Sequence, residues 1–182
     1  MAGALIRIPD PSLVVLIGAA GAGKSTFARR WFAPAEILSS DALRAELGQG
    51  EDDQRISRSA FSVLHERLAR RLAAGLLTVV DATNVQATAR RALLARRPGP
   101  AFPAIAVVLE TAPAEVHARN RARLDRVVPA TVVERQLAAV GQMSDQRLVA
   151  DGFAAIHRVA DTTRITVARD AASPRRETAR RT

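Results

Sequence analysis

The sequence predicts a three-layer α/β domain built on a parallel sheet of about five strands. Short runs rich in Val, Ile and Leu alternate along the chain with longer segments whose apolar residues recur at helical spacing. The short runs are continuously apolar, which is typical of parallel strands buried on both faces. The 182 residues are enough for one well-developed core, and no internal repeat interrupts them. We therefore expect one domain over residues 1–170.

Each predicted strand is a short apolar run that ends at or beside a turn residue or a polar residue. The five runs are residues 12–18, 35–41, 76–84, 102–110 and 163–168. The second run ends on Asp41, and the third contains Asp81 near its end. Ligands of open α/β sheets bind where the carboxyl ends of the strands meet, so we expect both aspartates beside a ligand.

Helices are predicted between these strands. The segments are residues 24–32, 42–47, 56–74, 86–97, 113–123 and 129–143. In the longest, apolar residues recur every three or four positions, acidic residues precede the first turn, and Gly75 closes the last. Pro98 ends the fourth segment. The last residues, 171–182, are rich in arginine and show no periodicity, so we expect a disordered tail there.

The composition favours an anionic partner. The formal net charge is +9, and all but one of the 27 basic side chains are arginines. A solvated basic face is the alternative explanation of this charge. With five Phe, one Trp and no Tyr, the chain has few platforms for base stacking, so a bound nucleic acid would be held by its phosphates. The lack of cysteine and of an apolar run suited to a membrane span or a signal peptide favours a cytoplasmic protein with no membrane partner.

A phosphate-binding loop is the most specific motif in the sequence. Residues 18–25, GAAGAGKS, match G-x-x-x-x-G-K-[ST] between a predicted strand and a predicted helix. The backbone amides of such a loop and the helix start cradle nucleotide phosphates, and Ser25 can ligate Mg²⁺. Lys24 is the only lysine in a chain that otherwise uses arginine. A compact ammonium on a thin stem fits this loop better than a forked guanidinium, which explains why lysine stands at this position. The predicted nucleotide-binding residues here are Gly18, Gly21, Ala22, Gly23, Lys24, Ser25 and Thr26.

Two aspartates indicate what kind of reaction the loop serves. One carboxylate commonly orients Mg²⁺ or its waters at this edge of the sheet, and Asp81 is the candidate. A second is useful where the acceptor is a hydroxyl whose proton must be taken, and Asp41 is the candidate base. Arg44 lies three residues further on, on the same helical face, and suits an acceptor that carries a phosphate beside its hydroxyl. The alternative is a helix N-cap at Asp41 and a solvent-exposed ion pair at Arg44.

A cluster of arginines predicts a lid at about residues 113–128. The segment ARNRARLDR places Arg119 and Arg123 four residues apart on one helix face, with Arg121 and Arg126 nearby. In a lid that closes over the nucleotide, Arg119 and Arg123 would stabilise the charge of the transferring phosphoryl group. An exposed basic helix is the alternative.

Taken together, the motifs resemble the kinase module of bacterial polynucleotide kinase–phosphatases, which heal RNA and DNA ends. The resemblance covers about residues 13–142 and is carried by LVVLIGAAGAGKSTFARRWF, ILSSDALR, DDQ, GLLTVVDATN and ARNRARLDR, in that order and spacing. It implies a P-loop phosphotransferase fold, often oligomeric, that uses ATP and Mg²⁺. It also implies that Asp41 is the general base on the 5′-hydroxyl and that Arg44 contacts the acceptor, to which we also assign Arg126.

On the nucleotide side, the resemblance implies that Lys24, Arg119 and Arg123 contact the ATP phosphates, with Ser25 as a Mg²⁺ contact. Two features depart from that family. Its kinase module usually heads a longer chain with phosphatase and ligase modules, for which this sequence has no segment, and Leu124 stands where a proline is common.

Three functions remain open at this stage. The first is an ATP-dependent polynucleotide 5′-hydroxyl kinase, which the net charge and Arg44 favour. The second is a small-molecule hydroxyl kinase acting on an antibiotic, a sugar or a nucleotide sugar, which would share every residue on the nucleotide side. The third is a catalytically idle nucleotide-binding module that recruits partners, against which Asp41 argues.

Overall fold

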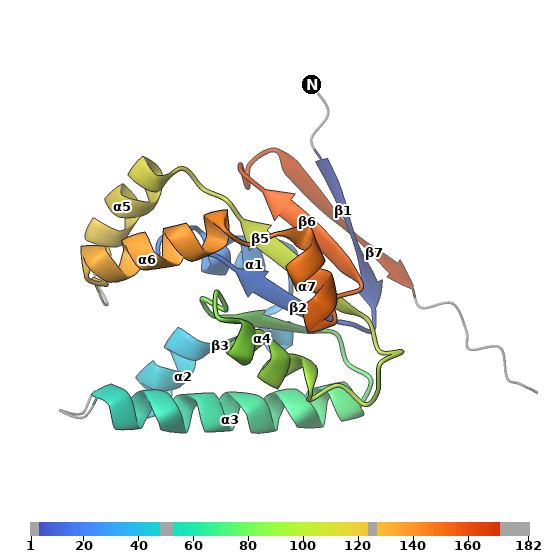
Figure 1. Ribbon diagram of the computed structural model, residues 1–182. Helices are drawn as coiled ribbons and strands as arrows, with labels where there is room; N and C mark the ends of the chain where they lie inside the picture. Colours follow the sequence, from blue (N-terminus) through green and yellow to red (C-terminus); the bar gives the residue numbers. More distant parts are fainter. Residues whose placement is uncertain (1–3, 48–52, 124–126, 172–182) are drawn as a thin grey trace, which may run out of the picture.

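The computed structural model describes residues 4–47, 53–123 and 127–171, and these form an α/β domain on a five-stranded sheet (Figure 1). The strand order is β3-β4-β2-β5-β6, and all four pairings are parallel. The strands are β2 (Leu13–Ile17), β3 (Ile37–Ser39), β4 (Thr78–Asp81), β5 (Ala104–Leu109) and β6 (Ala155–Val159). The predicted fold class is therefore confirmed.

The three central strands explain the continuously apolar runs in the sequence. Every residue of β2, β4 and β5 is buried, because the sheet is covered on both faces. Alternate residues of β2 belong to two separate cores: Val15 lies in the core that contains Leu68, and Val14 in the core that contains Phe27. The sheet therefore separates two apolar layers.

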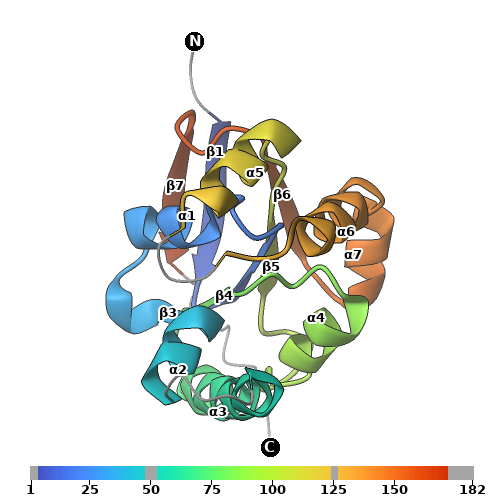
Figure 2. The same ribbon diagram turned by 90° about the vertical axis from the view of Figure 1, so that its left-hand side faces the viewer.

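The helices divide between these two layers. Their bounds are α1 (Lys24–Trp31), α2 (Ser40–Leu47), α3 (Asp53–Ala73), α4 (Ala87–Leu94), α5 (Pro113–Arg121), α6 (Ala130–Gly141) and α7 (Asp145–Asp151), with a 3₁₀ turn at Pro34–Glu36. Helices α3, α4 and α7 cover one face of the sheet, and α1 and α5 contribute to the core on the other (Figure 2). Among the helices that the structure describes, none combines the length and the apolar character needed to cross a membrane.

Two strands form a small separate sheet. β1 (Ala4–Asp10) pairs in parallel with β7 (Ile165–Ala171), and buried residues of both strands complete the core that contains α1. The strand predicted at 163–168 therefore exists as β7 but does not belong to the main sheet. The fifth strand of the main sheet is β6, which the sequence analysis missed, as it missed β1 and α7. In β6 the segment AIHRV carries two polar residues and is mostly half-buried, so it lacks the apolar run of a central strand.

The helices that flank the phosphate-binding loop lie at the carboxyl ends of the strands. Figure 1 shows α2, α5 and α6 on the side of the molecule toward which the main strands point. Helix α5 covers most of the predicted lid, and α6 follows it after the described residues resume at 127. Arg126 and Leu124 lie outside the described residues, as does the predicted tail beyond Ala171.

A buried ion pair fixes α7 against α4. The side chains of Arg90 and Asp151 are 4% and 1% exposed, and the guanidinium donates to one carboxylate oxygen from Nη2 at 2.6 Å and from Nε at 2.9 Å. The other carboxylate oxygen accepts from Arg91 Nε at 2.7 Å. Arg90 Nη1 also donates to the carbonyl of Val85 at 2.8 Å, so the same guanidinium holds the loop that follows β4.

We expect Asp151→Ala to lower the free energy of unfolding by about 3–5 kcal/mol, because it leaves the Arg90 charge buried without its counter-charge. Chemical denaturation measures this loss. The matched control is Asp145→Ala, which removes a 59% exposed carboxylate from Arg158 and should cost less than about 1 kcal/mol. Equal losses in the two variants would show that burial of the Arg90–Asp151 pair does not set its contribution.

Candidate nucleotide and acceptor site

The phosphate-binding loop joins β2 to α1 and is shaped by glycines. Gly21 and Gly23 have φ angles of 89° and 91°, in the left-handed region that L-residues with a side chain rarely adopt. A Cβ on Gly21 would stand 2.6 Å from the carbonyl oxygen of Val116 in α5, so the loop runs directly against that helix. Gly23 is the N-cap of α1, which leaves the first amides of the helix facing the loop.

Lys24 crosses this loop and is buried. Its Nζ donates to the carbonyl oxygens of Gly18 at 2.9 Å and of Ala19 at 2.8 Å. Loss of hydration on burial lowers the pKa of the Lys24 ammonium to about 8, although the nearby carboxylates of Asp81 and Asp41 act in the opposite direction. The ammonium is therefore held in a poorly hydrated position where an added anionic group would stabilise its charge strongly.

Ser25 and Asp81 meet as the sequence predicts for a Mg²⁺ site. The Ser25 hydroxyl donates to the Asp81 carboxylate at 2.6 Å, and Asp81 is buried at the end of β4. A hydroxyl and a carboxylate are oxygen ligands of the kind that Mg²⁺ prefers, and Mg²⁺ in nucleotide sites takes its remaining ligands from phosphates and water. These two residues therefore fit Mg²⁺ and would hold it beside the loop.

Contacts far apart in the sequence brace the loop, and the sequence analysis did not find them. Thr111 Oγ1 donates to the carbonyl of Ala22 at 2.9 Å, and Gln136 Oε1 accepts from the Ala20 amide at 2.8 Å. Asn84, which has a φ of 50°, donates from Nδ2 to the carbonyl of Leu16 at 2.8 Å and so ties the turn after β4 to β2. The asparagine that ends VVDATN was the available signal for this last contact.

Two of the residues predicted to contact the acceptor, Asp41 and Arg44, lie in α2. Asp41 lies in the first turn of that helix and pairs with the guanidinium of Arg44, three residues further on. Its other carboxylate oxygen lies 3.4 Å from Nη2 of Arg123. The Asp41 charge also acts on the ammonium of Lys24, so this carboxylate and the loop belong to one site. The Arg44 guanidinium lies 5.9 Å from the centroid of the Phe61 ring in α3.

The two arginines expected on the phosphates take different positions. Arg119 pairs with Glu115 in α5, and its Nη1 stands 3.2 Å from where a Cβ on Gly23 would lie, so it is beside the phosphate loop. Arg123 instead reaches Asp41, the residue predicted to act on the acceptor. Arg126, assigned to the acceptor from the sequence, lies outside the described residues.

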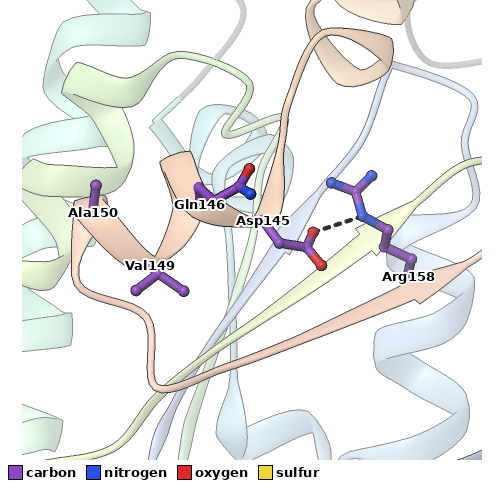
Figure 3. Close-up of a pocket in the computed structure, with 5 residues that line it drawn as sticks. All are labelled: Asp145, Gln146, Val149, Ala150 and Arg158. Atoms are coloured by element: carbon purple, nitrogen blue, oxygen red, sulfur yellow. Dashed lines mark hydrogen bonds and ion pairs between the residues drawn. The ribbon is translucent and has the colours of Figure 1, made fainter.

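A separate surface pocket lies between α7 and β6 and does not touch this site. Figure 3 shows Arg158 donating to Asp145 beside Gln146, Val149 and Ala150 of α7. Arg158 Nε donates to the Asp145 carboxylate at 2.8 Å, and the same guanidinium contacts Glu110 and the carbonyl of Met143. The pocket's main charged group is thus already paired.

Comparison with known proteins agrees with the fold and the loop. The sequence profile described as "AAA domain" matches residues 13–143, and a search of curated proteins found no significant match. A chain of the Pnkp1/Rnl/Hen1 RNA repair complex is 19% identical, with a TM-score of 0.60 over 74% of this chain and 45% of that chain. Kti12 of Chaetomium thermophilum, solved with ADP-AlF3, is 17% identical, with a TM-score of 0.60 over 81% of this chain and 88% of that chain.

Shikimate kinase from Acinetobacter baumannii, solved in complex with shikimate, has the same fold. It is 19% identical, with a TM-score of 0.52 over 83% of this chain and 85% of that chain. At sequence identities of 17–19%, these three similarities establish the fold but do not identify the acceptor. The residues around Asp41 must therefore carry any argument about the acceptor.

Proposed function

The chain belongs to the AAA domain family, and we propose that it is an ATP-dependent kinase that phosphorylates the 5′-hydroxyl end of DNA or RNA. One observation carries the proposal: Asp41, half-exposed beside the phosphate loop, is flanked by the guanidinium groups of Arg44 and Arg123. A carboxylate between two cations suits an acceptor that brings a hydroxyl to be deprotonated and an anionic group to be bound.

The proposed reaction is a direct transfer of the γ-phosphoryl group. A bond forms between the acceptor's 5′ oxygen and the γ-phosphorus, the bond between that phosphorus and the β–γ bridging oxygen breaks, and ADP leaves. Asp41 takes the proton of the hydroxyl. Lys24 binds the outer phosphates of the donor, and Arg119 and Arg123 stabilise the charge of the transferring group. Ser25 and Asp81 would hold Mg²⁺, which would supply positive charge beside the donor phosphates.

A small-molecule hydroxyl kinase is the second candidate function. The observation that favours it is the fold shared with shikimate kinase, a protein solved with a small hydroxyl compound bound. This alternative uses the same loop and the same base. It differs in needing no contact to a phosphate of the acceptor.

A transfer assay with labelled ATP separates the two. We expect phosphorylation of a short 5′-hydroxyl oligonucleotide, and we expect kcat/KM to fall with salt at a log–log slope of about −0.7 for each phosphate contacted on a single strand, with about two or three contacts. A panel of sugars, aminoglycosides and small alcohols is assayed beside it. A flat salt profile together with efficient phosphorylation of an uncharged small compound would contradict the polynucleotide function and favour the alternative.

Arg44 should distinguish acceptors by their phosphates. We expect Arg44→Ala to raise KM for the oligonucleotide more than KM for ATP, and to have a smaller effect on a nucleoside without a 3′-phosphate. The matched control is Arg70→Ala, which removes a 76% exposed arginine paired with Glu66 on α3 and should leave both constants unchanged. Equal losses on the two acceptors would show that Arg44 does not contact that phosphate.

A further inference from the structure

Phe61 is the one exposed aromatic side chain of the protein. The chain has five Phe, one Trp and no Tyr, and the structure describes all six of these residues. Phe27, Phe32 and Phe153 are buried, and Phe102 and Trp31 are half-buried against the cores. Phe61 is 38% exposed. Phe61 is therefore the most exposed of the six aromatic side chains, and its surroundings indicate what its ring could contact.

Phe61 is not among the buried residues of the apolar face of α3. That face consists of Ala60, Leu64, Leu68 and Leu72, all fully buried under the sheet. At about 100° per residue, Phe61 projects between Leu68 and Leu72 on the helix circumference, but it lies two to three turns nearer the N-terminus of α3 and is 38% exposed. Helix α2 lies along this part of α3, as Figure 1 shows, and Arg67 of α3 holds it there by donating to both carboxylate oxygens of Glu46, at 2.7 and 3.2 Å.

Its position links the ring to the acceptor-side residues. The Arg44 guanidinium lies over the Phe61 ring at 5.9 Å from its centroid, and the same guanidinium pairs with Asp41. Arg44 Nε is buried and has no hydrogen-bond partner among the residues that the structure describes. One guanidinium thus separates the exposed ring from the carboxylate that would take the acceptor's proton.

We infer that Phe61 is a specificity-determining residue that stacks on the base of the acceptor's terminal nucleotide. The inference rests on the proposed function and names the part of the acceptor that the site contacts. A terminal nucleotide carries its 5′-hydroxyl, its base and its 3′-phosphate on one sugar. Asp41, Phe61 and Arg44 supply a base catalyst, an aromatic face and a cation in one connected cluster. Stacking on an aromatic ring accepts any nucleobase, so this contact would select nucleic-acid ends without selecting their sequence.

The test compares two acceptors that differ only in the terminal base. One is a short 5′-hydroxyl oligonucleotide, and the other has an abasic sugar as its first residue. We expect Phe61→Ala and Phe61→Leu to lower kcat/KM on the base-bearing acceptor about tenfold or more, through KM, and to leave the abasic acceptor and KM for ATP unchanged. Phe61→Trp should restore the base-bearing rate. The matched control is Leu76→Ala, which removes a 46% exposed apolar side chain after the end of α3.

A binding measurement gives a second readout that does not depend on turnover. In the W31F/F61W variant, the base-bearing acceptor should quench the indole fluorescence and the abasic acceptor should not. An equal loss on both acceptors in Phe61→Ala and Phe61→Leu would overturn the inference, because Phe61 would then only support Arg44. Wild-type protein that phosphorylates small alcohols but neither oligonucleotide would overturn the proposed function itself, a result distinct from the first.

Discussion

Lys24→Arg and Lys24→Ala are both expected to abolish phosphoryl transfer. The ammonium lies inside the loop within 2.9 Å of two carbonyl oxygens, and the loop's glycines leave it little surplus space. A guanidinium is planar and wider, so it cannot occupy this position without moving the loop, which already runs against the backbone of α5 at Gly21. Charge alone should therefore not rescue the activity.

The measurement is turnover of a labelled donor, with the unfolding midpoint recorded for each variant. Lys24→Met serves as the reference for folding, because it fills the same channel with an uncharged chain of similar length and should keep the midpoint. Arg30→Lys on the exposed face of α1 is the matched control for exchange of the two cations. An arginine variant with near-normal turnover would show that the ammonium is not positioned as described.

The pKa of Lys24 adds a pH dependence of known sign. With a pKa of about 8, the free protein loses this charge as the pH rises through that value. Bound phosphates favour the ammonium, so the complex holds more protons than the free protein, and ATP affinity should fall as the pH rises above about 8.

The same pKa affects folding. The cost of burying the charge is fully present below pH 8 and disappears as the pH approaches the pKa of lysine in the unfolded chain, about 10.4, so the free energy of unfolding should rise over that window. Lys24→Met should show neither effect.

Local patterns predicted the elements that the sequence specifies by itself. The loop motif, the continuous apolar runs of β2, β4 and β5, and the apolar residues of α3 at helical spacing are each contained in one short segment, and the structure confirms each. The missed strands carry a weaker pattern. β1 shows the alternation of a half-buried strand only at Ile6 and Ile8, and β6 is mostly half-buried, so pairing with distant segments decides that both are strands.

In the candidate site, too, local patterns predicted some contacts, and packing between distant segments determined the others. Ser25 and Asp81 follow from rules about strand ends and loops, so their contact could be predicted without coordinates. Arg123 was expected beside Arg119 because the two are four residues apart, yet it reaches Asp41, 82 residues away in the sequence. Gln136, which accepts from the Ala20 amide across 116 residues, belongs to no motif. Contacts of this length depend on how α5 and α6 pack over the loop, and spacing in one sequence does not encode that packing.

Asp41→Asn is expected to lower the rate of the chemical step by about 10²-fold or more while leaving ATP affinity nearly intact. The amide keeps the size of the side chain and can still accept a hydrogen bond, but it cannot take the proton of a hydroxyl. Asp41 lies in the first turn of α2, and in the proposed mechanism it acts on the acceptor, whereas the loop and Asp81 act on the donor. Single-turnover kinetics with saturating ATP separate the chemical step from binding.

Two control substitutions test whether the loss of turnover is specific to Asp41. Asp170→Asn removes a partly exposed carboxylate that accepts from Arg7 Nη1 at 3.0 Å in the small sheet, and it should leave turnover unchanged. Asp81→Asn should instead raise the Mg²⁺ concentration needed for half-maximal activity, because it removes a ligand oxygen beside Ser25. An Asp41→Asn protein with normal turnover and weakened ATP binding would place Asp41 on the donor side and exclude it as the base, since a proton acceptor acts on the chemical step and a donor contact acts on affinity.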